Sequence, residues 1–499
     1  MSAKNITRFV IFSAIYSYIG KAISSIFTAL AFVLIVRSLS IIDYGRYTFY
    51  INAVFFVTLL LDFGMAEVIL RYVPEYIEEK NAPAVKWLLE KAIFVISTAC
   101  IIAISLSVVF MHFFPNLTIR FQLSGILPYI ILFGWLRIIM LILGNILNAF
   151  LLQSYRITCE IGISTMRLIC IYILLQKGAD AWLLIVLYGL LDLLIILVFY
   201  LKIGKLFKVV VAKAKREALS RMRRFGINEY LYRLFWFFTD NRFDIYMVGI
   251  ILGLAPAGYI AFAAGIVNLL IDWSPGLIIR PVVAPLFIQA YSAKRDISQI
   301  QYLFKLHNKF LIFITLPIFV SIAILFDKAI IFVFSPKYLP SLNVFFVFIA
   351  SMFLINILIP LRNIIAIMER SDISNFTNIV AIPKIILILF LAKSTGIIGV
   401  AFIYALSLLA IIWINIWLIK REIKLSFPWK SFFKIALNSG AMALVLYFLR
   451  PAIANKISLA LVSIVGIAVY LFASYLNKAF ENNERDLFNR AFKARIWCF

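Results

Sequence analysis

The sequence is poor in charged residues and very poor in cysteine and histidine. Asp, Glu, Lys and Arg together make up 14% of the 499 residues, and the chain has four cysteines and two histidines. The cysteines form no CxxC pair, and no His/Cys cluster has the spacing of a ligand set, so we expect no structural or catalytic metal site. No GxxxxGK[ST] frame occurs, so an ATP site and other bound cofactors are not expected either.

Hydrophobic residues are correspondingly abundant. They make up 64% of the chain, and the mean hydropathy is +1.03, whereas a soluble domain is about 45–50% apolar. A soluble fold of this composition would expose large apolar patches and aggregate. The apolar runs are long and continuous, and they do not alternate as in a β-barrel, so the sequence predicts an all-α polytopic membrane protein.

The apolar runs are long enough for about fourteen membrane-spanning helices, because one span needs roughly 20 mostly apolar residues. We place them near residues 9–36, 46–70, 88–113, 122–149, 158–176, 181–201, 226–252, 257–287, 307–326, 338–366, 374–392, 397–419, 432–449 and 456–476.

Basic residues outnumber acidic ones by 48 to 23. They are concentrated in the short segments between apolar runs, on the side of both predicted termini, which is the bias of cytoplasmic loops. This pattern predicts a multi-pass protein of the cytoplasmic membrane with both ends in the cytoplasm and in contact with membrane lipids. It argues against nucleic acid as the partner of the basic excess.

A basic connector at 202–224 divides the first twelve predicted spans into two sets of six. Short motifs recur in both sets, and Asp62 and Asp272 stand 210 residues apart at matching places. We therefore predict two six-helix bundles in a pseudo-twofold arrangement, over 1–215 and 216–424, and a final helix pair with a tail over 425–499. Parallel repeats of this kind are typical of transporters.

Charged side chains occur inside the predicted spans, where each costs roughly 2.5–3.5 kcal/mol if it faces lipid. Lys21, Arg137 and Arg167 have no acid nearby on their own helices, so they require either acids on facing helices or an anionic substrate. Arg and Lys are well suited to a diphosphate. The cations that we predict to line a cavity for a diphosphate substrate are Lys21, Arg137, Arg167, Arg233, Arg242 and Lys384.

The acids in the spans can be accommodated in several ways. Glu229 and Arg233 are four residues apart and could pair along one helix face, and Glu67 lies near a span end, where it can reach the membrane surface. Asp62, Asp244 and Asp272 are candidates for H+ or Na+ coupling or for gating.

Two stretches carry a resemblance to a known family. Residues 20–76 contain Arg37 at the end of a span, the turn Asp43-Tyr44-Gly45-Arg46-Tyr47, and Asp62-Phe63-Gly64; residues 240–263 contain Asp244 followed by Gly258 and Tyr259. These motifs resemble the polysaccharide-export (Wzx-type) flippases of the multidrug/oligosaccharidyl-lipid/polysaccharide exporter superfamily.

The resemblance implies two helix bundles around a central cavity and a substrate made of an oligosaccharide on a polyprenyl (pyro)phosphate carrier. It implies translocation by alternating access, no enzymatic activity, and glycan polymerases or glycosyltransferases as possible partners. Two alternatives remain open at this stage. One is a cation-coupled exporter of drugs or small metabolites, and the other is a membrane glycan polymerase or transferase, which would need a larger outer loop than the sequence offers.

Overall fold

The computed structural model describes residues 3–79, 81–115, 125–206, 216–272, 297–367, 373, 376–420 and 426–492. Every regular element in these ranges is a helix, so the predicted all-α class is confirmed. The chain forms two compact units, Met1–Gly258 and Tyr259–Phe499. The domain boundaries predicted at 215/216 and 424/425 stay predictions.

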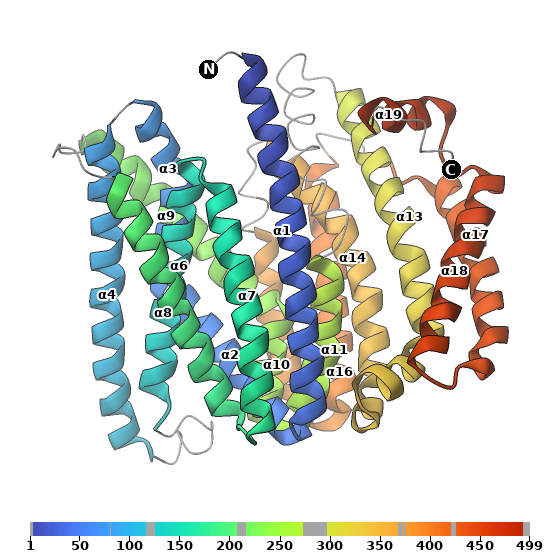
Figure 1. Ribbon diagram of the computed structural model, residues 1–499, viewed down its shortest axis with the longest axis horizontal. Coiled ribbons are helices and arrows are strands. Elements are labelled where there is room, and N and C mark those ends of the chain that lie inside the picture. Colours follow the sequence, from blue (N-terminus) through green and yellow to red (C-terminus); the bar gives the residue numbers. More distant parts are fainter. Residues whose placement is uncertain are drawn as a thin grey trace. The chain divides into compact units, whose positions relative to one another are not determined.

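The first unit is built from nine helices and the start of a tenth among its described residues (Figure 1). They are α1 (Ala3–Ser38), α2 (Ile41–Asp62), α3 (Met65–Glu78), α4 (Ala82–Phe113), α6 (Leu127–Ala149), α7 (Gln153–Gln176), α8 (Ala181–Leu206), α9 (Arg216–Thr239), α10 (Asn241–Ile251) and the first residues of α11 (Leu254–Asp272).

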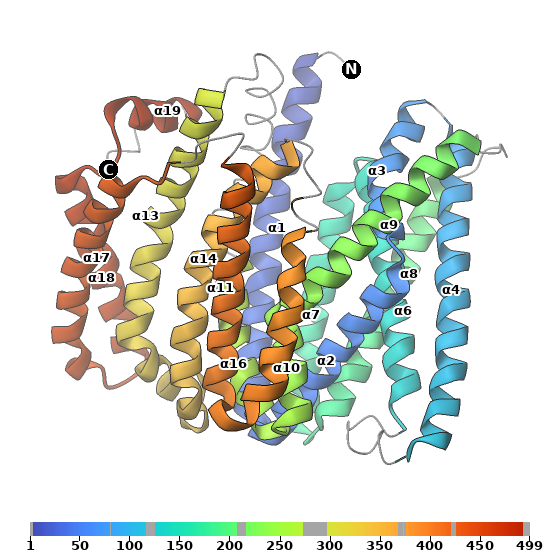
Figure 2. The ribbon, with the colours of Figure 1, turned by 180° about the vertical axis from the view of Figure 1, so that it is seen from behind.

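The second unit contains the rest of α11 and the C-terminal helices, which Figure 2 shows from behind. Its main helices are α13 (Ile297–Ala329), α14 (Leu342–Ile367), α16 (Ala381–Ile419), α17 (Trp429–Leu449), α18 (Lys456–Asn477) and α19 (Asn482–Phe492).

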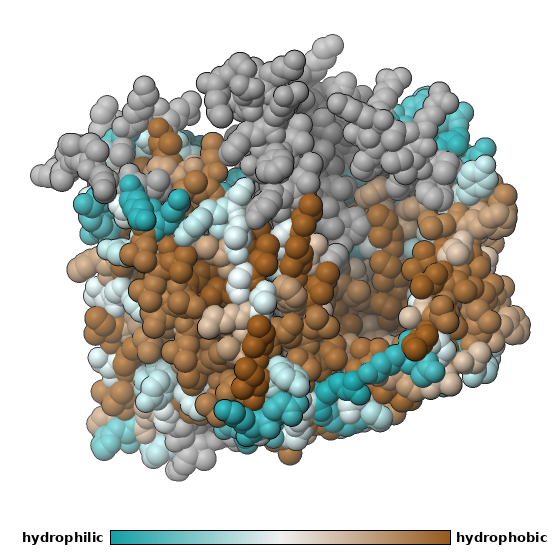
Figure 3. All heavy atoms as spheres, viewed as in Figure 1, coloured by the Kyte–Doolittle hydropathy of each residue, from teal (hydrophilic) through white to brown (hydrophobic). Residues whose placement is uncertain are grey.

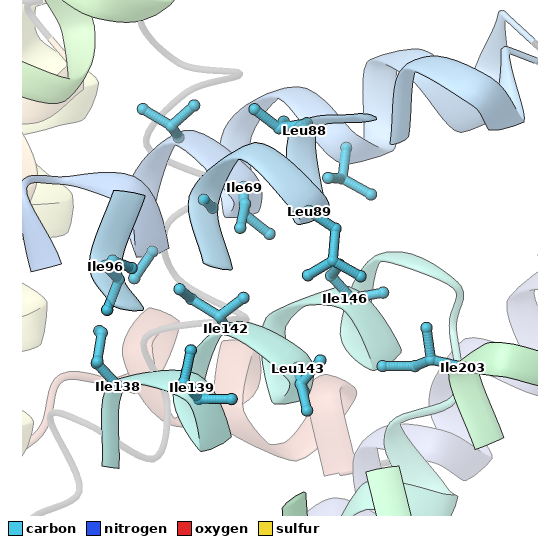
Figure 4. Packing of buried hydrophobic residues seen from close by; sticks show 14 of the residues in the cluster. Ile69, Leu88, Leu89, Ile96, Ile138, Ile139, Ile142, Leu143, Ile146 and Ile203 are labelled. Carbon is cyan, nitrogen blue, oxygen red and sulfur yellow. The ribbon is translucent and has the colours of Figure 1, made fainter. Parts of the chain in front are cut away.

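The core of the first unit lies around α6, which packs against α2, α3, α4 and α8. Isoleucine and leucine side chains from α3, α4, α6 and α8 meet there, as Figure 4 shows for Ile69, Leu89, Ile142 and Ile146. Ile69, Ile142 and Ile146 are fully buried. This packing positions two of the predicted site residues, Arg137 on α6 and Asp62 at the end of α2.

In the second unit, α17 and α18 pack against α13. The Tyr470 hydroxyl donates a hydrogen bond of 2.6 Å to the backbone oxygen of Phe313, and Arg450 pairs with Asp327 at 2.7 Å. The Lys309 ammonium pairs with Glu484, and both side chains are almost fully buried. These contacts attach the C-terminal helices and α19 to α13.

The outward-facing surfaces of the helices are apolar. Phe94 is 66% exposed, Phe390 is 78% exposed and Leu437 is 71% exposed, and Figure 3 shows hydrophobic side chains over the middle of the described helices, with hydrophilic ones gathered near their ends. Large apolar side chains remain exposed in this way when the surrounding solvent is lipid. The protein is therefore a multi-pass membrane protein, as predicted.

The described residues contain 11 helices that are long and apolar enough to cross a membrane, or 12 if the bent pair α2–α3 is one span. Two features separate this count from the predicted fourteen. The predicted spans 374–392 and 397–419 both fall largely in α16, which Gly396 kinks. The predicted span 226–252 is divided at Asp240 between α9 and α10, and neither is counted. The count of fourteen and the two-bundle arrangement stay predictions.

A close helix crossing explains the glycine of the Asp43–Tyr47 motif. A Cβ atom on Gly45 would lie 1.9 Å from the backbone oxygen of Leu254, and one on Gly258 would lie 2.5 Å from that of Ile41. Only glycine allows two backbones to approach so closely. The two motif glycines thus hold the start of α2 against the start of α11.

The helix pair α2–α3 bends by 54° at a two-residue break. Phe63 and Gly64 both adopt left-handed backbone conformations, with φ of 46° and 77°. A Cβ atom on Gly64 would lie 2.1 Å from the backbone oxygen of Gly226 on α9. The break therefore needs glycine both for its backbone conformation and for its contact with α9.

Replacing Gly64 by alanine should lower the free energy of unfolding by at least about 2 kcal/mol, because it combines left-handed strain with a steric clash. The thermal unfolding midpoint of the purified protein in detergent measures this. The matched control is Gly162→Ala on α7, where a Cβ atom would meet nothing within 4 Å. The control should be neutral or slightly stabilising, by about 0.5–1 kcal/mol, and equal losses in both variants would contradict the assignment.

Candidate functional site

Asp62 lies at the end of α2 and connects three helices. One carboxylate oxygen accepts a hydrogen bond of 2.9 Å from the backbone N–H of Ala66, in the first turn of α3, and the other accepts one of 2.7 Å from Arg233 on α9. Asp62 is fully buried. This backbone amide is one of the N–H donors that the start of a helix leaves without partners, so Asp62 both caps α3 and pairs with the guanidinium of Arg233.

Arg233 lies between two carboxylates. Besides its bond to Asp62, its guanidinium is 3.6 Å from Glu67 on α3. From the sequence, Arg233 could pair with Glu229 along α9, and Glu67 could reach the membrane surface. Instead, the ion pairs of Arg233 run from α9 to α2 and α3. The Asn145 side chain on α6 donates a hydrogen bond of 3.1 Å to the backbone oxygen of Ala66, which ties α6 to the same turn of α3.

Arg137 has an acidic partner on a facing helix. Its guanidinium donates to both carboxylate oxygens of Asp192 on α8, at 3.1 and 3.4 Å. The Asp192 side chain is 7% exposed, whereas 41% of the Arg137 side chain is exposed. A guanidinium has five N–H donors, and both bonds come from a single terminal nitrogen, so Arg137 retains donors on its accessible side.

Arg167 lies over an aromatic ring. Its guanidinium carbon is 4.6 Å from the centre of the Tyr188 ring, and the Tyr47 hydroxyl donates a hydrogen bond of 3.1 Å to the Tyr188 hydroxyl. The Arg167 Nε is buried, and it has no hydrogen-bond partner among the described residues. The arrangement connects α7 and α8 to the Asp43–Tyr47 motif of α2 and leaves a buried donor for an incoming acceptor.

Other predicted residues of the first unit lie on α1 and α10. Lys21 is exposed on α1, which packs along α7. The guanidinium of Arg242 lies 4.4 Å from the ring centre of Phe55, while its backbone N–H donates to Asp240, the cap of α10, at 2.9 Å. Asp244, one turn further along α10, is fully buried.

In the second unit, Lys384 is 1% exposed on α16, and its ammonium lies 5.2 Å from the ring centre of Tyr404. Asp272 is the last residue of α11, and its side chain lies outside the described part of the chain. Of the predicted site residues in the described ranges, Asp62 and Arg233 are in direct contact.

Three features of this site were not predicted from the sequence: Asp192, Tyr188 and the link between Glu67 and Arg233. The one sequence signal for Asp192 was that it is an acid inside a predicted span. Nothing in the sequence indicates which helix it faces. Within the described residues, no group of three or more His, Cys, Asp or Glu side chains is placed to hold a metal ion.

Comparison with known proteins decides the family. The family model described as "Polysaccharide biosynthesis protein" matches residues 11–290, which is more than half of the chain. The chain belongs to this polysaccharide biosynthesis family. The family prediction from the motifs is thereby confirmed. No curated protein sequence matches the chain.

Solved structures similar to this member of the polysaccharide biosynthesis family are flippases and transporters. One is the lipid II flippase MurJ in an inward closed conformation, with 18% identity and a TM-score of 0.70 over 97% of this chain and 100% of that one. Another is an inward-facing multidrug resistance MATE family transporter of the MOP superfamily, with 13% identity and a TM-score of 0.63 over 82% of this chain and 98% of that one. A MOP superfamily transporter from Pyrococcus furiosus matches at 15% identity, with a TM-score of 0.53 over 83% of this chain and 95% of that one. At these identities the likeness shows the fold.

A double-mutant cycle tests the Asp62–Arg233 pair. Arg233→Gln leaves a buried carboxylate without its cation, and such a loss costs about 3–5 kcal/mol for a fully buried pair. Because the Arg233 side chain is 30% exposed, we expect the lower end of that range. Asp62→Asn should also destabilise the protein, since it leaves Arg233 with Glu67 alone.

The double variant Asp62→Asn/Arg233→Gln should lose at least about 1 kcal/mol less than the sum of the two single losses, because neither charge is then left without its partner. The free energy of unfolding in mixed micelles gives all three values. Strict additivity would contradict a direct pair.

Proposed function

We propose that this protein is a flippase that moves a polyprenyl-(pyro)phosphate-linked oligosaccharide across the cytoplasmic membrane for surface polysaccharide or glycan biosynthesis. In this proposal, fourteen spans form two six-helix bundles and a final helix pair, and the bundles give alternating access to the substrate. The protein transports its substrate and does not catalyse a covalent reaction.

The single observation that carries the proposal is the presence of cations with free donor capacity within apolar helices. Arg167 has a buried Nε without a hydrogen-bond partner among the described residues and is held by the Tyr188 ring. Arg137 is oriented by Asp192 while 41% of its side chain remains accessible. A phosphate accepts charge-assisted hydrogen bonds from such groups, and a neutral or cationic drug would gain nothing from them.

The aromatic and hydroxyl groups beside these cations suit the sugar part. The Tyr47 hydroxyl donates a hydrogen bond of 3.1 Å to the Tyr188 hydroxyl next to Arg167. Tyrosine combines an apolar ring with a polar hydroxyl, so this pair offers both a stacking surface and hydrogen bonds to a glycan attached to the diphosphate.

The acids serve the transport cycle in this proposal. Asp62 holds Arg233 and caps α3 at the bend of the α2–α3 span. Protonation of Asp62, or competition by the substrate phosphate for Arg233, would weaken the contact between α9 and the bend. Asp62, Asp244 and Asp272 are therefore our candidates for coupling or gating, with H+ or Na+ as the ion.

The second candidate function is cation-coupled export of drugs or small metabolites, which the similarity to MATE transporters favours. Those matches cover 82–85% of this chain, whereas the match to the flippase MurJ covers 97%. A whole-length counterpart among flippases supports the first proposal over the second.

Reconstitution into liposomes tests the proposal with a fluorescent polyprenyl-diphosphate oligosaccharide, whose arrival in the outer leaflet is read by chemical quenching. We expect the wild-type protein to accelerate translocation over empty liposomes. Arg167→Ala should reduce the rate at least about tenfold, which corresponds to the loss of roughly 1.4 kcal/mol of phosphate binding in the transport step.

The matched control is Lys177→Gln, which removes an exposed cation just beyond the end of α7 and should leave the rate unchanged. A cationic dye supplied to the same liposomes tests the second candidate. Transport of the dye without any translocation of the lipid-linked glycan would overturn the flippase proposal.

A further inference from the structure

A second group of cations lines a cleft between α3 and α9. The cleft has a volume of about 560 Å³ and is lined by Arg71 and Tyr72 of α3 and by five residues of α9. The two helices are in contact with one another, and Figure 2 shows both of them from the side on which α9 lies in front.

The lining residues of α9 form one face of the helix. Arg221 and Arg224 are three positions apart, and Ser220 and Asn228 flank them at the spacing of helical turns. These side chains provide two guanidiniums, a hydroxyl and an amide. Arg71 of α3 adds a third guanidinium. No acid is among the described residues that line the cleft, although Arg71 also pairs with Glu75 at 2.9 Å.

The cleft also has aromatic lining. Tyr72 and Phe225 pack edge to face, with ring centres 5.9 Å apart. The guanidinium carbons of Arg71 and Arg221 lie 5.9 and 5.7 Å from the Tyr72 ring centre. A ring that contacts two guanidiniums orients them without neutralising their charge. A guanidinium has five N–H donors, so Arg71 and Arg221 keep donors for an external anion, Arg71 in addition to its pair with Glu75.

The two helices that form the cleft also expose apolar side chains. Leu70, Leu219 and Ile227 are each next in sequence to a lining residue, on another face of the helix, and they are 45%, 37% and 46% exposed. Arg71 and Tyr72 lie within Met65–Ile77, a segment that together with α2 is apolar enough to be a membrane span. An anionic group attached to an apolar chain satisfies both features at once, whereas a free anion uses only the arginines.

We propose that this cleft binds the phosphate group of a membrane lipid, with Arg71, Arg221 and Arg224 on the phosphate oxygens and Tyr72 and Phe225 beside them. Guanidinium groups bind phosphate through paired hydrogen bonds. The phosphate belongs either to an anionic phospholipid or to a polyprenyl diphosphate, which present the same chemistry. The cleft shares no residue with the cations proposed for transport, so the proposal stands without the flippase assignment.

The test uses native mass spectrometry to measure lipid binding to the purified full-length protein in detergent micelles. The probes are phosphatidylglycerol, undecaprenyl diphosphate, phosphatidylcholine and inorganic pyrophosphate. The first two should bind to the wild-type protein, and Arg221→Gln/Arg224→Gln should weaken that binding at least about tenfold, since charge-assisted hydrogen bonds are the stronger class. Arg221→Lys/Arg224→Lys should give an intermediate loss, because lysine retains the charge without the planar fork.

The matched control is Arg223→Gln, which removes an exposed arginine of the same helix that does not line the cleft. It should bind the lipids as the wild type does.

The two anionic probes distinguish the source of the phosphate. Stronger binding of undecaprenyl diphosphate would identify the lipid carrier as the ligand, and equal or stronger binding of phosphatidylglycerol would identify the bulk lipid. Both results support the site. Each single variant, Arg221→Gln and Arg224→Gln, provides the same comparison if the double variant does not fold.

Three results would overturn the proposal. One is unchanged binding in the cleft variants. Another is an equal loss in Arg223→Gln, which would show that only the general positive charge of α9 matters. The third is binding of inorganic pyrophosphate or phosphatidylcholine as tightly as the anionic lipids.

Discussion

The first unit depends on compensation of the buried Asp62 carboxylate. A charge in an apolar medium is strongly destabilising unless hydrogen bonds and an opposite charge satisfy it. Asp62 receives an N–H group of α3 and the guanidinium of Arg233, and this requires the α2–α3 span to bend where it does and α9 to lie against the bend. The left-handed Gly64 and its contact with Gly226 meet the same requirement in the backbone. The contacts of this charge thus coincide with the bend between α2 and α3.

Most of the helices could be predicted from the sequence, because a span must be long, apolar and helical in lipid. Charge pairing could not, because the partners lie on helices that are distant in sequence. Arg233 and Asp62 are 171 positions apart, and Arg137 and Asp192 are 55 apart. A local rule favoured Glu229 for Arg233, yet the tertiary partners of Arg233 prevail in the structure. The charged segment 226–252 was predicted as one span because hydropathy does not reveal the cap that Asp240 provides for α10.

The cations of the first unit differ in how much of their hydrogen-bonding capacity the protein uses. Arg233 lies between two carboxylates, Arg137 has one, and Arg167 has an aromatic ring. The three arginines of the α3–α9 cleft form a further set. This gradation underlies the roles that we propose: Arg233 for the bend, Arg137 and Arg167 for a substrate phosphate, and the cleft arginines for a lipid phosphate. The chain belongs to the polysaccharide biosynthesis family and shares the fold of the flippase MurJ over the whole length of that protein.

The proposed function requires the groups around Arg167 to face water and the substrate, while the outer face of the same helices meets lipid. A cysteine at Tyr188, in a variant that lacks the natural cysteines, tests it with a charged thiol reagent applied to both sides of the membrane, because the reactive thiolate forms in water and not in lipid. The matched position is Leu190, two residues further on α8 and 59% exposed on its surface. We predict labelling at position 188 that a lipid-linked diphosphate blocks, and little labelling at position 190. Equal labelling at both positions, or none at 188, would contradict this claim.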